Sequence, residues 1–216
     1  MDREYLAQFE SDRERERIFL QAQKMLSDLG LSIDEVVKKH RVLDVGASTA
    51  ILEKAVGLKG DGKNFVSLSL EAPSQVKGKG LNFVVANASN TPFESGSFDL
   101  LISRNGPIYL TQTQFEADAI LQEMLRVQSA DGETRIYPIR FGFIKQQLFD
   151  QNPEYFNLHA KAASQRSIRD NQHLRNFNET ANQRTLDYLQ KEGIRFETGL
   201  GNNTEDSLPG YVTLFK

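Results

Sequence analysis

With 216 residues, of which 39% are hydrophobic and 25% charged, the chain is long enough for one sizeable globular domain and short for two independent ones. No apolar run approaches the roughly 20 residues of a membrane-spanning helix, and the net charge of −3 does not indicate a nucleic-acid partner, so we expect a cytoplasmic protein without membrane attachment. The absence of cysteine excludes disulfides, thiolate metal sites and cysteine nucleophiles, and the three scattered histidines predict no metal site.

The first 40 residues predict a helical extension. A capping pattern at Ser11–Glu14 precedes apolar residues at helical spacing, which predicts a helix over 11–29 that ends at Gly30. A second capping pattern at Ser32–Glu35 predicts a short helix before residue 41. The charged face of the first helix is expected to be exposed to solvent.

From residue 41 onward, short apolar runs alternate with helical patterns. Helices are predicted over about 49–58 and 113–127, the second after a capping box at Thr113–Glu116, and Asp131-Gly132 predicts a turn. Strands are predicted in five runs: 41–46, 64–70, 82–88, 98–104 and 133–140. This alternation indicates an α/β fold with a mostly parallel sheet covered by helices on both faces.

The region 141–179 interrupts the alternation and is expected to be a helical or lid insertion within a domain of residues 41–216. Its aromatic residues either line a pocket for a substrate or pack as a helical cover against the sheet, the second being favoured. These residues are Phe141, Phe143, Phe149, Tyr155 and Phe156. Its arginines are candidates to contact an anionic substrate or RNA phosphate. These are Arg166, Arg169 and Arg175.

The end of the chain predicts one more helix and two strands. Thr180 is expected to cap a helix that runs to about residue 192. The runs 194–200 and 210–216 are strand-like and flank a turn-rich stretch, which predicts an antiparallel hairpin.

The loop after the first strand, in the stretch RVLDVGASTA at residues 41–50, is the first candidate for a binding site. In open α/β sheets, ligands bind outside the carboxyl ends of the strands. A dinucleotide fingerprint would require glycine at positions 46, 48 and 51, and only Gly46 satisfies it. A P-loop is excluded as well, because no Gly-Lys-Ser/Thr follows. A tight turn made of small residues is the alternative.

Three stretches in chain order carry a resemblance to a known family. They are VLDVGASTA from residue 42, NFVVANASNTPFESGSFDLLISRNGPIYL from residue 82 and EADAILQEMLRVQSADGETRIYPI from residue 116. Over residues 41–140 the chain resembles the class I S-adenosylmethionine-dependent methyltransferases, most specifically in Thr91-Pro92-Phe93 and Ser97-Phe98-Asp99. The resemblance implies a seven-stranded Rossmann-like sheet, a C-terminal antiparallel hairpin and the cofactor S-adenosyl-L-methionine.

The resemblance also implies which residues bind the cofactor. Asp44 would orient the loop after the first strand and the amino group of the cofactor, while small residues would allow the backbone to approach it closely. The expected set is Asp44, Gly46, Ala47, Ser48, Ser69, Leu70, Glu71, Asn87, Ala88 and Arg104.

Three of these positions depart from the family pattern, and the first is Ser48, which stands where the family has a second glycine but is small enough for close approach. Ser69 stands where an acidic residue usually holds the ribose hydroxyls, and Glu71, two residues further on, is a substitute if the strand continues. Asn87 stands where aspartate usually reads the adenine amino group, and its carbonyl oxygen can still accept that hydrogen bond. The alternative is that Asn87 is a turn residue.

Methyl transfer requires an acceptor held in line with the methyl group and, for some acceptors, a base. The stretch SRNGPIY after the fourth strand loosely resembles the Asn-Pro-Pro-Tyr motif of amino methyltransferases, which makes Asn105 and Tyr109 the catalytic candidates. A general acceptor-side loop is the alternative.

The function predicted from the resemblance is a methyltransferase enzyme. The alternative is a non-catalytic protein of the same fold that acts as a scaffold or partner subunit, because several positions of the pocket are altered. The sequence leaves open whether the acceptor is a small molecule or a macromolecule, and it leaves the oligomeric state open.

Overall fold

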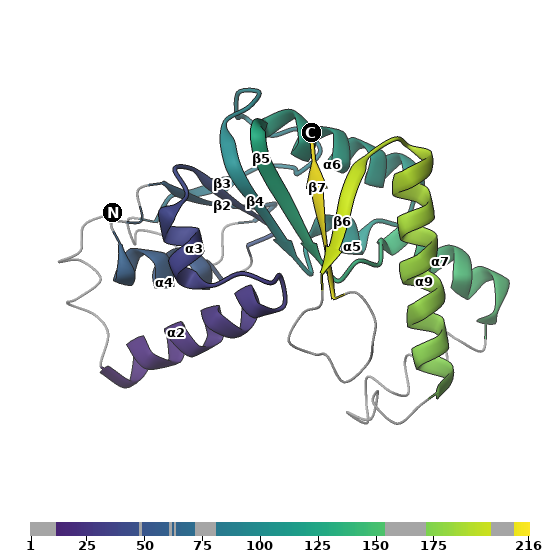
Figure 1. Ribbon diagram of the computed structural model, residues 1–216, viewed down its shortest axis with the longest axis horizontal. Coiled ribbons are helices and arrows are strands. Elements are labelled where there is room, and N and C mark those ends of the chain that lie inside the picture. The colour runs from purple at the N-terminus through teal and green to yellow at the C-terminus, as the bar shows by residue number, and fades with distance from the viewer. Residues whose placement is uncertain are drawn as a thin grey trace.

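A seven-stranded sheet organises the molecule, and its strands follow the order β3-β2-β1-β4-β5-β7-β6 (Figure 1). β1 to β5 are parallel to their neighbours, whereas β7 runs antiparallel to both β5 and β6. The strands are β1 (Val42–Val45), β2 (Phe65–Ser69), β3 (Phe83–Val85), β4 (Phe98–Arg104), β5 (Gln128–Tyr137), β6 (Arg195–Gly199) and β7 (Tyr211–Phe215). This computed structural model describes residues 12–47, 49–60, 62, 64–71, 81–153, 172–199 and 210–216.

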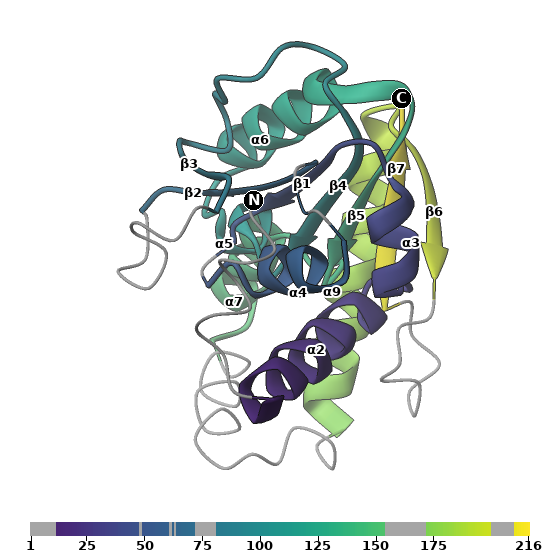
Figure 2. The same cartoon turned by 90° about the vertical axis from the view of Figure 1, so that its left-hand side faces the viewer.

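Helices cover both faces of the sheet, with α2 and α4 on one side of the strands and α6 on the other (Figure 2). The described helices are α2 (Asp12–Ser27), α3 (Ile33–Lys38), α4 (Ile51–Lys59), α5 (Pro107–Leu110), α6 (Gln114–Val127), α7 (Gly142–Gln151) and α9 (Gln172–Lys191). The capping boxes predicted at Ser32–Glu35 and Thr113–Glu116 are both present. The one predicted at Ser11–Glu14 includes a residue outside the described ranges.

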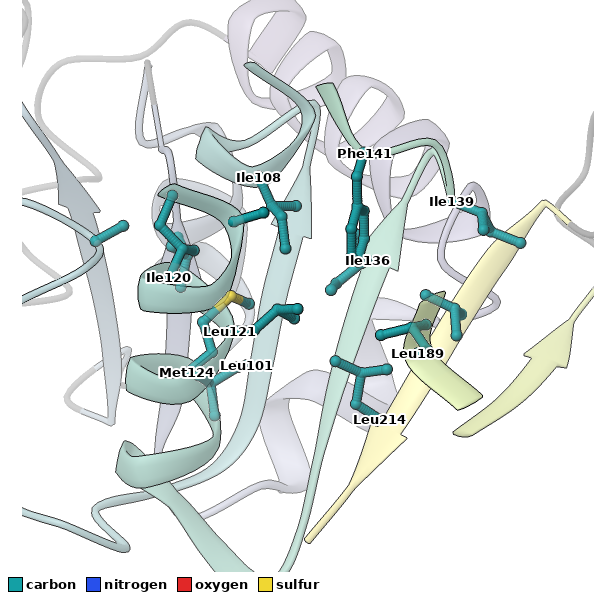
Figure 3. Close-up of a cluster of buried hydrophobic side chains, with 14 of the residues drawn as sticks. Leu101, Ile108, Ile120, Leu121, Met124, Ile136, Ile139, Phe141, Leu189 and Leu214 are labelled. Carbon is teal, nitrogen blue, oxygen red and sulfur yellow. The ribbon is translucent and has the colours of Figure 1, made fainter. Parts of the chain in front are cut away.

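The alternation of side chains along the strands divides the core into two clusters. Val42 of β1 and Leu100 of β4 point toward α2, α3 and α4, while Leu43 and Leu101, one residue further on, point to the opposite face. On that second face, side chains of α5, α6 and α9 pack against β4, β5 and β7 (Figure 3). Burial on both faces explains why β1 and β4 are apolar along almost their whole length.

The N-terminal helix α2 is fixed to the sheet at its C-terminal end. Gly30 adopts a left-handed φ of +64°, and Leu31 N–H donates to the carbonyl of Leu26 (2.9 Å), which closes the helix. Arg135 of β5 donates to the carbonyls of Leu29 (3.0 Å) and Gly30 (2.9 Å). These bonds satisfy carbonyls that a helix end leaves without an intrahelical partner.

The stretch Thr91-Pro92-Phe93 lies between β3 and β4 and is held by helix α6. The carboxylate of Glu123 accepts hydrogen bonds from the backbone N–H (2.7 Å) and the hydroxyl (2.6 Å) of Thr91. Arg126 pairs with Glu123 and donates to the carbonyl of Phe93 (2.8 Å). The hydrogen bond from Arg126 lowers the pKa of Glu123 to about 2, so this carboxylate stays ionised at neutral pH.

Two predictions about local structure were wrong in detail. Thr180 does not cap the last helix, because α9 begins at Gln172 and the Thr180 hydroxyl donates to the carbonyl of Asn176 (2.8 Å) inside it. Asp131-Gly132 forms a bulge inside β5 rather than a turn before it. The short helix α5 was not predicted. Two helices, α7 and the first part of α9, occupy the region 141–179.

The aromatic residues of that region pack as a helical cover. Phe141 and Phe143 are buried in the core, and Phe149 stacks on Phe177 of α9 with ring centroids 4.9 Å apart. Tyr155, Phe156, Arg166 and Arg169 lie outside the described ranges, as does the side chain of Arg175. None of the helices in the described part of the chain is long and apolar enough to cross a membrane.

Candidate cofactor site

A pocket of about 370 Å³ opens at the carboxyl ends of β1, β2, β3 and β4. This is the edge at which open parallel sheets bind ligands, on both sides of the point where the strand order reverses next to β1. The residues that line it are Met25, Asp44, Gly46, Ala47, Thr49, Ala50, Ile51, Leu68, Ser69, Leu70, Ala86, Asn87, Ala88, Arg104, Asn105, Gly106, Pro107 and Leu110.

The loop after β1 is shaped by close contact with the loop after β4. The carbonyl of Leu68 accepts hydrogen bonds from the N–H groups of Gly46 (2.8 Å) and Ala47 (3.0 Å), which fixes the turn. Gly46 has φ +93°, and a Cβ there would lie 2.8 Å from Cδ of Pro107 and 2.9 Å from Cα of Gly106. Only glycine fits both the conformation and the space at this position.

The opposite wall of the pocket carries a strained residue. Asn105 has φ +50°, a left-handed conformation that is uncommon outside glycine, and its N–H donates to the carbonyl of Tyr137 at the end of β5 (2.7 Å). The next residue, Gly106, has no room for a side chain, because a Cβ would lie 2.3 Å from Oγ of Ser103 and 2.6 Å from the carbonyl of Val45. Asn105 therefore lines the pocket in a left-handed conformation, next to a position that only glycine can occupy.

Asp44 is the electrostatic centre of the pocket. Its side chain lines the cavity, its residue is 5% exposed, and its carboxylate accepts no hydrogen bond from any residue that the structure describes. Burial raises the pKa of Asp44 to about 7, the negative charge of Glu53 adds to this increase, and Arg104 opposes it. Near neutral pH the carboxylate is therefore divided between its protonated and ionised forms.

A second buried carboxylate, Glu53 of α4, lies behind the pocket. It accepts hydrogen bonds from the hydroxyl of Ser67 (2.7 Å) and from the backbone N–H of Asn82. Burial raises the pKa of Glu53, and the two hydrogen bonds oppose this shift. Unlike Asp44, Glu53 has its polar partners inside the protein.

Arg104 at the end of β4 is bound to the N-terminal segment rather than to Asp44. Its Nε donates to Oδ2 of Asp28 (2.8 Å), and its Nη2 lies 2.7 Å from the same oxygen. Asp28 is itself buried, and Met25, one turn earlier in the chain, lines the pocket. The pocket is thus completed by residues before the first strand, and the main cation near Asp44 is already shared with another carboxylate.

Asn87 lines the pocket beyond β3, and its side chain stabilises the turn that contains it. Its side-chain oxygen accepts hydrogen bonds from the backbone N–H and the hydroxyl of Ser89, both at 3.0 Å. A carboxamide oxygen has two lone pairs, so this oxygen is fully used within the protein. The side-chain NH₂ group is what remains for a ligand, in contrast to the predicted role in which the oxygen would bind adenine.

The sequence comparisons place this site in a known domain. Residues 43–136, which span β1 to the end of β5 and supply most of the pocket lining, match the family model described as a methyltransferase domain. These residues form a methyltransferase domain. The predicted class, an S-adenosylmethionine-dependent methyltransferase, and the predicted cofactor are therefore confirmed. No curated protein matches the chain in sequence.

Solved structures agree on the fold of this chain. A candidate S-adenosylmethionine-dependent methyltransferase from Methanococcus maripaludis is 17% identical, with a TM-score of 0.51 over 100% of this chain and 93% of that one. A candidate O-methyltransferase from Nostoc punctiforme is 12% identical, with a TM-score of 0.54 over 94% and 58% of the two chains. At such identities the likeness shows the fold alone, and it confirms the predicted seven-stranded sheet with its antiparallel C-terminal strands.

Most of the residues predicted to bind the cofactor come together around the pocket of the methyltransferase domain. Glu71 does not, because β2 ends at Ser69 and the alternation of side chains along a strand does not extend to residue 71. Tyr109 also lies outside the lining, and Ser48 is outside the described ranges. The residues of the predicted set that line the pocket are Asp44, Gly46, Ala47, Ser69, Leu70, Asn87, Ala88 and Arg104, and the catalytic candidate Asn105 joins them.

Sequence reasoning did not single out Met25 or Pro107 for this site. Met25 is one apolar residue among several at helical spacing, so no sequence signal separates it from the core positions of α2. Pro107 is part of the stretch SRNGPIY, but it was not predicted to line the site. Proline is common at the first position of a helix, which is a sequence signal for α5.

The unpartnered carboxylate at Asp44 predicts a gain of stability on removing its charge. Asp44→Asn should stabilise the protein by about 2–4 kcal/mol at pH 8, because the folded-state pKa of about 7 lies above the ordinary 3.8 and the ionised form is disfavoured by burial. The difference in the free energy of unfolding between the two proteins is largest above pH 7 and declines as the pH falls toward 4. Urea unfolding of both proteins from pH 4 to pH 8 measures it, and equal stabilities at pH 8 would contradict the assignment.

Proposed function

We propose that the pocket at the ends of β1–β4 binds S-adenosylmethionine and that the chain transfers its methyl group to an acceptor held beside Asn105. The observation that carries the proposal is the buried, unpartnered carboxylate of Asp44, which lines a cavity of about 370 Å³. A buried carboxylate without a partner is costly for a folded protein. A ligand with a cationic amino group, such as the methionine part of this cofactor, would provide the missing partner.

Each region of the pocket suits a different part of the cofactor. The Gly46-Ala47 turn presents backbone without bulky side chains, and Asp44 beside it would bind the ammonium group. Ser69 and Leu70 at the end of β2 would contact the ribose, and the NH₂ group of Asn87 with the apolar Ala88 would contact the adenine. These assignments rest on the position of each residue along the sheet edge.

We also propose that residues 1–40 form an extension to the domain of residues 41–216 and contribute to the cofactor site. Two observations support this. Met25 lines the pocket, and Asp28 holds the guanidinium of Arg104 with Nε–Oδ2 at 2.8 Å. A charged pair with one side chain 5% exposed is a rigid wall rather than a surface contact.

The bound cofactor supplies a methyl group activated on a sulfonium centre. The residues of the chain position the acceptor and exclude water, which is the main requirement of an in-line displacement. Asn105 is the proposed acceptor-side residue, because it lines the pocket in a strained conformation and its carboxamide makes no hydrogen bond within the described part of the chain. Tyr109 is not part of this proposal.

Binding of S-adenosylhomocysteine to the purified protein, measured by isothermal titration calorimetry, tests the proposed function. The natural chain should bind it at micromolar concentration or below, and Asp44→Asn should weaken binding roughly 30-fold, or about 2 kcal/mol, because a charge-assisted hydrogen bond to the ammonium group is lost. Asp131→Asn, at an exposed position in β5, is the matched control and should bind normally. No heat at millimolar ligand would favour the non-catalytic alternative.

The turn at Asn87 predicts a substitution that improves binding. In Asn87→Asp, one carboxylate oxygen can keep both hydrogen bonds from Ser89 while the second accepts from the adenine amino group. Because residue 87 is exposed in the free protein, its charge remains hydrated there. Affinity for S-adenosylhomocysteine should increase about fivefold, or about 1 kcal/mol. Asn87→Ala should weaken binding, and a loss of affinity in both variants would contradict this arrangement.

A further inference from the structure

We propose that the methyl acceptor carries an anionic group, a carboxylate or a phosphate, and that Arg140 binds this group together with Lys145. This inference rests on the proposed function, because it places the acceptor beside the cofactor pocket. It concerns residues that lie outside the pocket lining and outside the sequence motifs of the family.

Arg140 is a half-buried cation that forms no ion pair with a carboxylate among the residues that the structure describes. It follows the end of β5, and its Nη1 donates to the side-chain oxygen of Asn178 on α9. Its Nε is buried and makes no hydrogen bond to any residue in the described ranges. Burial lowers the pKa of the Arg140 guanidinium, and the nearby groups that counter this shift are the phenols of Tyr109 and Tyr137. A guanidinium stays charged in proteins, so Arg140 carries a partly buried positive charge whose hydrogen-bond partner in the described chain is a neutral carboxamide.

Three other arginines around the sheet have carboxylate partners. Arg104 pairs with Asp28 (2.7 Å), and Arg126 pairs with Glu123 (2.7 Å). Arg135 pairs with Glu133 (3.0 Å) and also donates to two carbonyls. Arg140 therefore stands out as a guanidinium whose fork has an open donor, which is the geometry that binds carboxylate or phosphate oxygens.

A second cation lies on the same tyrosine. Nζ of Lys145, on α7, is 4.0 Å from the centre of the Tyr109 ring, which is a cation–π contact. Lys145 forms no ion pair with a residue in the described ranges. Arg140 and Lys145 thus both lie near the Tyr109 side chain.

A polar acceptor completes the cluster. Asn182 lies four residues after Asn178 on α9, so the two side chains share one face of the helix. Oδ1 of Asn182 is buried and has no hydrogen-bond donor. An open donor on Arg140 and an open acceptor on Asn182 are both expected to be satisfied in the functional state, since buried polar groups are rarely left unpaired. A ligand bearing an anionic group and a hydroxyl or amino group would satisfy both.

The cluster adjoins the cofactor pocket on the side where an acceptor would enter. Tyr109 belongs to α5, whose Pro107 and Leu110 line the pocket. The carbonyl of Tyr137, three residues before Arg140, accepts the N–H of Asn105 (2.7 Å). Helices α5, α7 and α9 lie together on one side of the sheet (Figure 1). An acceptor anchored at Arg140 would therefore reach the pocket past Asn105.

The experiment is an anion titration followed through the Nε–Hε signal of Arg140 in ¹H–¹⁵N correlation spectra. The signal is assigned by its loss in Arg140→Lys. Benzoate and inorganic phosphate are the probes, benzamide is the neutral match for benzoate, and the titrations are run with and without S-adenosylhomocysteine. We expect a saturable shift with benzoate, phosphate or both, at about 1–10 mM, and none with benzamide. The anion that saturates identifies the class of acceptor.

The variants separate a built site from general charge effects. Lys145→Gln should weaken anion binding at least threefold, and Arg184→Lys, at a partly exposed position on α9 where the guanidinium donates to Gln151, should leave it unchanged. The inference is overturned if the Arg140 signal does not move up to 50 mM anion (roughly ten times the expected range), if benzamide moves it equally, or if Lys145→Gln has no effect. Failure of S-adenosylhomocysteine to bind would instead overturn the proposed function, and the two results are read in the same samples.

Discussion

The carboxylate of Asp44 is the constraint on which the site depends. It sits near the end of a strand that is buried on both faces, so the pocket is where it can meet a partner, and Arg104, the cation that lowers its pKa, is already bound to Asp28. A protein interior tolerates such a group only where its burial serves a bound partner or where it takes up a proton. The raised pKa of Asp44 means that, in the free protein, this carboxylate takes up a proton near neutral pH.

The shape of the pocket follows from how closely two loops approach. Gly46 and Gly106 lie against each other, and neither has space for a Cβ, so the ends of β1 and β4 meet without intervening side chains. This contact leaves the cavity on the side toward β2 and β3, where Ser69 and Asn87 face it. The family pattern has two further glycines in this loop, and here Ser48 and Ala50 take those positions. Ala50 has φ +52°, so the backbone keeps a conformation typical of glycine with a small side chain in its place.

The framework could be predicted from the sequence because its signals are local. Strand burial on two faces gives continuous apolar runs, and a capping box gives a recognisable pair at fixed spacing, so β4 and the starts of α3 and α6 were predicted to within one residue. The residues expected to bind the cofactor came from the family resemblance, and most of them line the pocket. Thr91-Pro92-Phe93 is the most specific part of the resemblance, and tertiary contacts with Glu123 and Arg126 of α6 hold it in place.

The sequence could not predict which polar side chains already have hydrogen-bond partners within the protein. The role of Asn87 changed because Ser89 occupies its oxygen, and Glu71 was lost because β2 ends two residues earlier than the alternation required. Arg140 and Asn182 look like ordinary polar residues in the sequence, and they became notable only where folding buried them with open hydrogen-bonding atoms. Whether a buried polar atom has a partner is decided by the tertiary structure, and it produces no periodic pattern in the sequence.

The central claim is that Asp44 changes from largely protonated to ionised when it meets the cofactor's ammonium group. The most direct measurement is the number of protons released on binding S-adenosylhomocysteine at pH 6.5, obtained by titration calorimetry in buffers of different ionisation enthalpy. With a free-state pKa of about 7, the natural chain should release between half a proton and one proton per site, roughly 0.7, and Asp44→Asn should release none. Tight binding without proton release from the natural chain, or equal release from both proteins, would contradict the account.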